Sequence, residues 1–310
     1  MTYLHLPRAL LSLQLRPLMV GGKRQASSEA HIKQPIPKGQ SHQRFREFDL
    51  QGKVFAVTGA GRGLGLTMAE ALVEAGGEVH CLDLLPKPHE DFHEAKARAN
   101  PDFGGALYYQ RMDVRDRQDS QEIMSSIASG KDRLDGVIAS AGVNHVCDAM
   151  DHTPEDIDRV IDINYKGVFT TATAAAHQML ERKTRGSILL VASMSGLIAN
   201  KKMNASIYNS SKAAVIQLGR SLAMEWAPID TQRRGGIRVN SLCPGHIVTP
   251  MVQKIIDQET GTKEVWESEN MLGRLARAEE FRGLALFLMS DASSFMTGSS
   301  IVCDGGHTAW

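Results

Sequence analysis

The chain has 310 residues, enough for one large domain or two small ones. Its 35 Lys and Arg residues equal its 35 Asp and Glu residues, so no overall electrostatic field favours nucleic acid or an anionic membrane as a partner. The four cysteines are scattered without a CxxC pair and the histidines show no HExxH spacing, so we expect reduced thiols and no metal site. No apolar run approaches the ~20 residues that span a bilayer, so no membrane association is expected.

The first 50 residues differ in composition from the rest of the chain. Residues 1–28 contain arginines and lysine but no acidic residue, and leucines crowd between the basic positions. This composition is typical of a mitochondrial transit peptide, and a disordered leader or an early start codon is the alternative. Residues 29–50 are polar and contain prolines, as a linker does. We expect a leader and linker over 1–50 and a mitochondrial or cytoplasmic protein.

Short apolar runs alternate with helical patterns from residue 51 onwards. The runs predict strands at 53–58, 78–82, 108–112, 134–139, 187–192, 237–242 and 300–303. Spacing of apolar residues predicts helices at 63–76, 117–129, 154–182 and 206–226. Alternating strands and helices predict an α/β protein with a doubly wound, seven-stranded parallel sheet and helices on both faces. No repeat or break in composition divides 51–310, so one domain is expected.

A glycine-rich turn joins the first predicted strand to the first helix. Gly59, Gly63 and Gly65 would allow a tight turn and a close approach of the backbone to a pyrophosphate, at which the helix points its positive N-terminus. A glycine triplet alone is weak evidence. This one follows a strand, opens a helix and precedes an acidic residue, Asp83, at the end of the second strand, about 20 residues on as in dinucleotide-binding domains.

Asp83 and Arg62 argue in opposite directions about the cofactor. A carboxylate at the position of Asp83 can accept hydrogen bonds from both adenosine ribose hydroxyls and would repel a 2′-phosphate, which favours NAD. Arg62, within the glycine-rich turn, could neutralise a 2′-phosphate or be a solvated turn residue. We expect NAD to be favoured, and NADP stays open.

Two further strand ends complete the cofactor prediction. Asp113 could bond an adenine amino group or cap the following helix. Ala141 and Gly142 would let the chain pass close to the cofactor. The predicted cofactor site also includes Leu64 and Val114, which neighbour these positions.

Tyr208 and Lys212 are four residues apart on a predicted helix and therefore share a face. An ammonium group near a tyrosine favours the phenolate and lowers a pKa that is near 10 in the free side chain. Tyr208 could then exchange a proton with an alcohol or a carbonyl. Ser193 ends the preceding strand, where its hydroxyl could hold the substrate oxygen or merely cap the strand end. The three residues predict a site for alcohol–carbonyl interconversion.

The combination Thr58-Gly59-x-x-x-Gly63-x-Gly65, Ser193, Tyr208-x-x-x-Lys212 and Pro244-Gly245 resembles the short-chain dehydrogenase/reductase family. The resemblance covers about residues 50–310. It implies a Rossmann fold, an NAD(P)-dependent oxidoreductase and a catalytic set of Asn164, Ser193, Tyr208 and Lys212.

The resemblance assigns further roles. Asn164 would hold a water that links Lys212 to a proton relay, and Lys212 would bond the nicotinamide ribose. Ile247 and Thr249 would contact the nicotinamide half, and Lys166 is included in the predicted cofactor site. Relatives commonly assemble through the two long helices, so a homo-oligomer, tetramer or dimer, is expected.

This sequence departs from the family pattern at two places. Ala139-Ser140-Ala141-Gly142 stands where the family has Asn-Asn-Ala-Gly, which should affect the bracing of a strand against a helix more than the chemistry. The interval from Ser193 to Tyr208 is longer than the commonest family spacing and reshapes the loop that faces the substrate. Ser195 is a rival for the serine role, on the opposite face if the strand continues.

The substrate prediction rests on the same resemblance. The sequence around Ser193 and Tyr208 resembles a branch that acts on sugar alcohols and ketoses, including fungal arabinitol, xylulose, sorbose and mannitol dehydrogenases. Residues 250–272 are predicted to form a mobile lid, whose apolar residues leave a secondary-metabolite ketoreductase or a 3-oxoacyl-thioester reductase open. A catalytically inactive cofactor-binding scaffold is the remaining alternative. The polar residues expected near the cleft are Asn144, His145, Asn200, Asn204 and His246.

Overall fold

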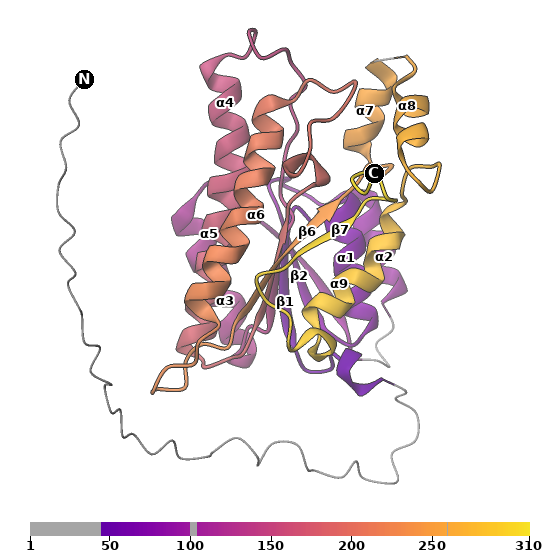
Figure 1. The fold of residues 1–310 in the computed structure, drawn as a ribbon. Helices are drawn as coiled ribbons and strands as arrows, with labels where there is room; N and C mark the ends of the chain where they lie inside the picture. Colours follow the sequence, from indigo (N-terminus) through magenta and orange to yellow (C-terminus); the bar gives the residue numbers. More distant parts are fainter. Residues whose placement is uncertain (1–44, 100–103, 259) are drawn as a thin grey trace, which may run out of the picture. The chain divides into compact units, whose positions relative to one another are not determined.

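Buried apolar strands form a seven-stranded parallel sheet at the centre of residues 45–310 (Figure 1). The structure, a computed structural model, describes residues 45–99, 104–258 and 260–310, so the predicted leader lies outside the described residues up to position 44. The strands are β1 Val54–Thr58, β2 Glu78–Asp83, β3 Ala106–Arg111, β4 Gly136–Ala139, β5 Ser187–Val191, β6 Arg238–Pro244 and β7 Ser300–Cys303. Their order in the sheet is β3-β2-β1-β4-β5-β6-β7, with every neighbouring pair parallel.

Helices cover both faces of the sheet, as the predicted fold class requires. They are α1 Gly63–Glu74, α2 Glu90–Arg98, α3 Arg117–Lys131, α4 Pro154–Ile161, α5 Val168–Glu181, α6 Ser206–Trp226, α7 Pro250–Gln258, α8 Thr262–Glu269 and α9 Arg282–Met289. Along β1, Val54 and Ala56 pack on the side of α3, α5 and α6, whereas Phe55 and Val57 pack on the side of α1 and α9. This alternation gives one hydrophobic core on each face of the sheet. The predicted doubly wound single domain is confirmed.

Several local features differ from the prediction. Leu50, the last residue of the predicted linker, is fully buried in the core that α1 and α9 share. The helix α2 was not expected, because its only buried residues are Phe92 and Ala95 in an otherwise charged segment. The single helix expected over 154–182 contains a π-helical segment, Asp162–Gly167, between α4 and α5. A π-helical turn holds one more residue than an α-helical turn and often marks a functional position.

The order of the strands places a crevice at the carboxyl ends of the central strands β1 and β4. The chain moves outward in opposite directions from the neighbouring strands β1 and β4, and ligands of doubly wound sheets bind beside the carboxyl ends of the strands at such a point. The predicted lid region contains α7 and α8, which lie together at this end of the domain (Figure 1). Within the described residues, no helix is both long enough and apolar enough to cross a membrane.

Candidate active site

A cavity of about 870 Å³ opens at the carboxyl ends of the strands. Its wall is formed by the turns and loops that follow β1, β2, β3, β4, β5 and β6. Most of the predicted site residues line this cavity, although they are up to about 190 positions apart in the chain. The doubly wound fold brings them together. These residues are Gly59, Arg62, Gly63, Leu64, Gly65, Asp83, Asp113, Val114, Ala141, Gly142, Ser193, Tyr208, Lys212, Ile247 and Thr249.

The glycine-rich turn has the conformation that only glycine adopts readily. Gly59 and Gly63 have φ angles of 67° and 61°. A Cβ atom on Gly59 would lie 2.7 Å from the Cα of Ala141, and one on Gly65 would collide with the carbonyl oxygen of Gly59. The turn is therefore closed on both sides by backbone, and the N-terminus of α1 faces the cavity. These features fit the pyrophosphate of a dinucleotide.

The Asp83 carboxylate is fixed at the end of β2. It accepts hydrogen bonds from the backbone N–H of Gly61 at 2.9 Å and of Leu85 at 3.2 Å. A Cβ on Gly61 would lie 3.0 Å from this carboxyl group, so the turn also needs a glycine there. The exposed Arg62 lines the same part of the cavity. Asp83 and Arg62, the two residues expected to set the preference between NAD and NADP, thus both line the cavity as predicted.

Asp113 lines the cavity but does not cap the helix that follows it. Its carboxylate pairs with Arg115, with 2.6 Å between Oδ2 and the guanidinium Nη2, and this pairing lowers the pKa of Asp113. The cap of α3 is Asp116, which accepts from the backbone N–H groups of Gln118 and Asp119. Of the two readings of Asp113, the capping one is therefore wrong.

Lys166 lies apart from the other predicted cofactor residues. Its ammonium is 2.6 Å from the Asp162 carboxylate, one turn away, and its side chain is 67% exposed. It is absent from the cavity wall. The salt bridge raises the pKa of Lys166, so the side chain is held as a surface cation.

Asn164 is fully buried in the π-helical segment and connects two parts of the site. Its Oδ1 accepts from the backbone N–H of Val143 at 2.8 Å, and its Nδ2 donates to the Val143 carbonyl at 2.9 Å and to the Ser211 hydroxyl at 3.1 Å. A Cβ on Gly142 would lie 3.4 Å from both Asn164 Oδ1 and Lys212 Nζ. Asn164 therefore fixes the loop after β4 against α6, beside the Lys212 ammonium.

Ser193 and Tyr208 meet at the cavity surface. Ser193 follows the end of β5, and its Oγ accepts a hydrogen bond from the backbone N–H of Ser195 at 3.1 Å. Ser195 itself is buried and does not line the cavity, so the geometry supports Ser193 for the serine role. Tyr208 is in the first turn of α6 and is partly buried.

Lys212 extends from the next turn of α6 and is almost completely buried. Its Nζ donates to the carbonyl oxygen of Val191 at 2.8 Å and lies 5.8 Å from the centre of the Tyr208 ring. Burial lowers the pKa of Lys212 to about 8, so the ammonium form still predominates at neutral pH. The predicted proximity of Tyr208 and Lys212 is present in the structure.

The pKa of Tyr208 differs from the expectation. Burial raises it, and a hydrogen bond with the Ser193 hydroxyl lowers it by a smaller amount. The expected lowering by Lys212 is wrong for this structure, because desolvation of the phenolate dominates at this distance. Tyr208 is therefore a neutral acid at physiological pH, ready to give a proton to a carbonyl oxygen.

The arrangement can perform proton transfer beside a hydride carrier. Ser193 can donate a hydrogen bond to a substrate oxygen, and Tyr208 can exchange a proton with that oxygen. Lys212 supplies a positive charge that favours the phenolate when Tyr208 has given up its proton. A bound nicotinamide dinucleotide, which the glycine turn and Asp83 fit, supplies the hydride acceptor or donor.

The loop after β6 forms another part of the wall. Ile247 is held by a short parallel bridge to Ala276, and Thr249 begins the segment that leads into α7, with its Oγ1 accepting from the backbone N–H of Val252 at 3.4 Å. Met251, Val252 and Ile255 continue this wall as an apolar surface. The lid segment thus contributes apolar side chains to the substrate end of the cavity, and its mobility remains a prediction.

The polar residues expected near the cleft separate into two groups. Asn144 and His145 line the cavity. His246 is buried with its ring stacked on Trp266 at 3.9 Å, and Asn204 is exposed. Asn200 is buried with both amide atoms unpaired and is outside the cavity wall.

Arg159 lines the cavity and was missed by the sequence analysis. It lies on α4, which is separated from β4 by a long loop. None of the recognised sequence motifs includes it or its neighbours. Its Nη2 lies 3.2 Å from Nδ1 of His145. Its basic side chain within the predicted helix 154–182 is a signal that could have pointed to it.

Comparison with known proteins agrees with this geometry. A family model described as enoyl-(acyl carrier protein) reductase matches residues 59–308. A short-chain dehydrogenase/reductase, notP', of Aspergillus versicolor is 39% identical over 91% of this chain and 95% of its own length. An NADP-dependent mannitol dehydrogenase of Hypocrea jecorina is 34% identical over 89% of this chain and 98% of its own length.

A solved structure shows the same architecture. The crystal structure of a short-chain type dehydrogenase/reductase from Mycobacterium marinum has a TM-score of 0.77 and 37% sequence identity, and the match covers 86% of this chain and 99% of that chain. The range of the family model, 59–308, includes the positions of Ser193, Tyr208 and Lys212. The chain belongs to the short-chain dehydrogenase/reductase family.

Proposed function

We propose that this protein interconverts a polyol and the corresponding ketose by hydride transfer to or from a nicotinamide cofactor. The observation that carries the proposal is the convergence of Ser193, Tyr208 and Lys212 on a cavity that also contains the glycine-rich cradle. The substrate end of this cavity has polar side chains in its wall, where Asn144 and Arg159 can bond hydroxyl groups. The mannitol dehydrogenase relative supports a substrate of this class.

The proposed cofactor is NAD. The Asp83 carboxylate is fixed by two backbone N–H groups, leaving it in position to accept from the ribose hydroxyls and to repel a 2′-phosphate. The exposed Arg62 and the NADP dependence of the mannitol dehydrogenase relative point towards NADP. We favour NAD because two backbone N–H groups hold the Asp83 carboxylate in place, whereas the side chain of Arg62 makes no capping hydrogen bond at the start of α1.

A second candidate function is reduction of a mainly apolar ketone. The observation in its favour is the apolar part of the cavity wall, which Met251, Val252 and Ile255 form. An apolar ketone would bury surface against these side chains, with a gain of about 25 cal/mol per Å². A polyol would instead leave this wall in contact with hydroxyl groups or water.

Steady-state kinetics with matched substrate sets separates the two functions. The purified protein is assayed with D-arabinitol, D-mannitol and galactitol in the oxidative direction, and with their ketoses and a series of aliphatic and aromatic ketones in the reductive direction, each with both cofactors. The proposal expects the highest kcat/KM with a polyol–ketose pair. Higher kcat/KM for apolar ketones would replace it with the second function.

Binding of reduced cofactor is measured in parallel by fluorescence. Binding without turnover of any substrate in either set would favour a catalytically inactive scaffold. Ser193→Ala serves as the control variant, because it keeps the cradle and should bind cofactor while losing turnover. If the wild-type protein turned over no better than Ser193→Ala, the observed turnover would not come from this site.

A further inference from the structure

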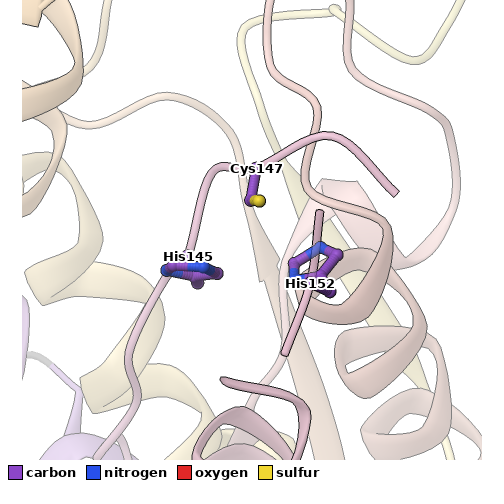
Figure 2. A group of neighbouring side chains, drawn as sticks. All are labelled: His145, Cys147 and His152. Atoms are coloured by element: carbon purple, nitrogen blue, oxygen red, sulfur yellow. The ribbon is translucent and has the colours of Figure 1, made fainter. Parts of the chain in front are cut away.

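Among the described residues, three possible metal ligands come together beside the substrate end of the cavity. His145, Cys147 and His152 belong to the loop between β4 and α4, and their ligand atoms all lie within 4.8 Å of one another. Figure 2 shows the Cys147 side chain extending towards the space between the two imidazole rings. We propose that these three side chains bind one divalent zinc-type cation, with a water molecule as the fourth ligand.

The distances are close to those of a tetrahedral site. Zinc bonds of about 2.0–2.3 Å in tetrahedral geometry place neighbouring ligand atoms roughly 3.5 Å apart. The separations in this cluster, all within 4.8 Å, exceed that value by no more than about 1.3 Å, which side-chain rotation in a half-buried loop can remove. Two imidazoles and a thiolate also form a donor set that selects zinc over magnesium or calcium, whose ligands are oxygen atoms.

His152 provides an independent sign of a missing partner. Both of its ring nitrogens are buried and neither has a hydrogen-bond partner. Leaving a buried polar atom unpaired costs about 1–3 kcal/mol, so such atoms are rare without a reason. The neighbouring ring of His145 lies 5.3 Å away, centre to centre. A cation between the two rings and Cys147 would satisfy a nitrogen of His152.

Charged groups around the loop favour a cation. The carboxylates of Asp148, Asp151 and Asp156 all lie close enough to Cys147 to act on it electrostatically, so the loop is a region of negative charge. Arg159 opposes a cation here, since its Nη2 lies 3.2 Å from Nδ1 of His145. Arg159 is itself paired with Asp156, at 3.5 Å.

The tautomer of His145 shows how it can serve as a ligand. Because the guanidinium of Arg159 can only donate, Nδ1 is the acceptor and the ring proton is on Nε2, which lies 3.5 Å from an Asp156 oxygen. A cation at Nδ1 would replace Arg159 and keep the Nε2–H directed at Asp156. A carboxylate behind a ligating histidine is the usual arrangement in metal sites, where it fixes the ring.

The loop is tied down next to the catalytic helix. The backbone N–H of Cys147 donates to the carbonyl of Asn204 at 2.7 Å, and Asn204 Nδ2 donates to Asp148 at 2.6 Å. His145 and Val146 belong to the cavity wall. The bound cation would therefore hold this part of the cavity wall without taking part in hydride transfer, and its presence does not depend on the substrate proposed above.

Metal content and cobalt spectroscopy test the site directly. The full chain, purified without a histidine tag, is stripped with a chelator, loaded with Zn²⁺ or Co²⁺, desalted and analysed for metal by mass spectrometry. We expect one ion per chain, and for Co²⁺ the absorption of a tetrahedral site with a thiolate ligand. Wild-type protein that retains no ion, or a cobalt spectrum without thiolate absorption, would overturn the proposal.

Variants identify the ligands. Cys147→Ser and His152→Gln should each weaken Zn²⁺ binding by more than the roughly 10–100-fold that loss of an outer partner costs, and Asp156→Asn by about tenfold. Cys303→Ser and His80→Gln remove a half-buried thiol and imidazole elsewhere and should bind as wild type does. Equal binding by Cys147→Ser and wild type would refute the site. Arg159→Gln, which leaves the three ligands in place, should bind Zn²⁺ more tightly than wild type, and weaker binding would contradict the role of Nδ1.

Discussion

The Lys212 ammonium donates a hydrogen bond of 2.8 Å to the carbonyl oxygen of Val191. Val191 is the last residue of β5, and Ser193 follows two positions later. The bond therefore fixes α6, which carries Tyr208, against the strand end that carries Ser193. This contact contributes to the positions of Ser193 and Tyr208, the two polar groups that address the substrate oxygen.

Lys212 should make the stability of the protein depend on pH. Its pKa falls from 10.5 to about 8 in the folded protein, so between these values the unfolded chain binds more protons and stability rises with pH. The penalty for the buried charge is fully present below about pH 8 and absent above pH 10.5, and the difference corresponds to about 3 kcal/mol. Urea unfolding of wild type and Lys212→Met between pH 7 and pH 10.5 measures it. A difference between the two proteins that does not change with pH would contradict the lowered pKa.

Tyr208→Phe should keep cofactor binding and lose turnover. The ring still packs in the first turn of α6, but no proton can be exchanged with the substrate oxygen. We expect kcat to fall by at least about 10²-fold, the lower end of general acid–base catalysis. Stopped-flow turnover and cofactor fluorescence measure the two quantities separately. Wild-type kcat in this variant would remove Tyr208 from the acid–base role.

Asp83→Ala should reduce the preference for NAD over NADP. Removing the carboxylate removes both the acceptor for the ribose hydroxyls and the repulsion of a 2′-phosphate. The ratio of kcat/KM for the two cofactors should change by about tenfold or more, because like charges brought together cost several kcal/mol. Arg62→Ala is the matched variant and should shift the ratio the other way. A wild-type protein that prefers NADP would show that Arg62 outweighs Asp83.

Gly65→Ala should abolish cofactor binding. The new Cβ would collide with the carbonyl oxygen of Gly59, a backbone atom of the same turn, so the turn would have to change the shape that fits the cofactor. Gly130→Ala is the control, since a Cβ there meets nothing within 4 Å and alanine favours the helix by up to about 1 kcal/mol. Isothermal titration with cofactor distinguishes them. Tight binding by Gly65→Ala would mean that the turn opens in the bound protein.

Asn164→Ala should lower the free energy of unfolding of the protein as well as its kcat. The substitution leaves the Val143 backbone groups and the Ser211 hydroxyl without their buried partner, which should cost about 1–3 kcal/mol. Glu225→Ala, at an exposed position of α6, should change the free energy of unfolding by no more than about 0.5 kcal/mol. Thermal and urea unfolding of both variants test this. Equal stability of Asn164→Ala and wild type would show that the loop after β4 does not depend on the amide.

The sheet and the catalytic residues could be predicted because their signals are local. β1 and β5 are short apolar runs whose every residue is buried, and such runs mark central parallel strands. Tyr208 and Lys212 share a helix face through their spacing alone. The glycine-rich turn can be recognised from the sequence because Gly59 and Gly63 adopt backbone conformations that other residues avoid.

The remaining features depend on the tertiary structure. Helix α2 has a charged sequence with only two buried residues, so its apolar pattern is too weak to recognise. The raised pKa of Tyr208 follows from burial, which spacing along a helix cannot reveal. The cluster of His145, Cys147 and His152 has no standard ligand spacing, and the fold of a loop brings the side chains together. Arg159 reaches the cavity only because α4 lies beside that loop.

Residues from the lid and from the stretch before α6 form one small hydrophobic core. Trp266 of α8 and Ile255 of α7 pack with Met203 and Ala205, and Tyr208 packs against the same group. The Trp266 indole N–H also donates to the carbonyl of Lys201 at 3.2 Å. A change in the conformation of the lid would therefore disturb the stretch before α6, and the reverse also holds. Redirecting this enzyme to another substrate by grafting loops would therefore require both segments to be replaced together. A graft of one segment alone would remove the packing partners of the Trp266 indole and disturb Tyr208.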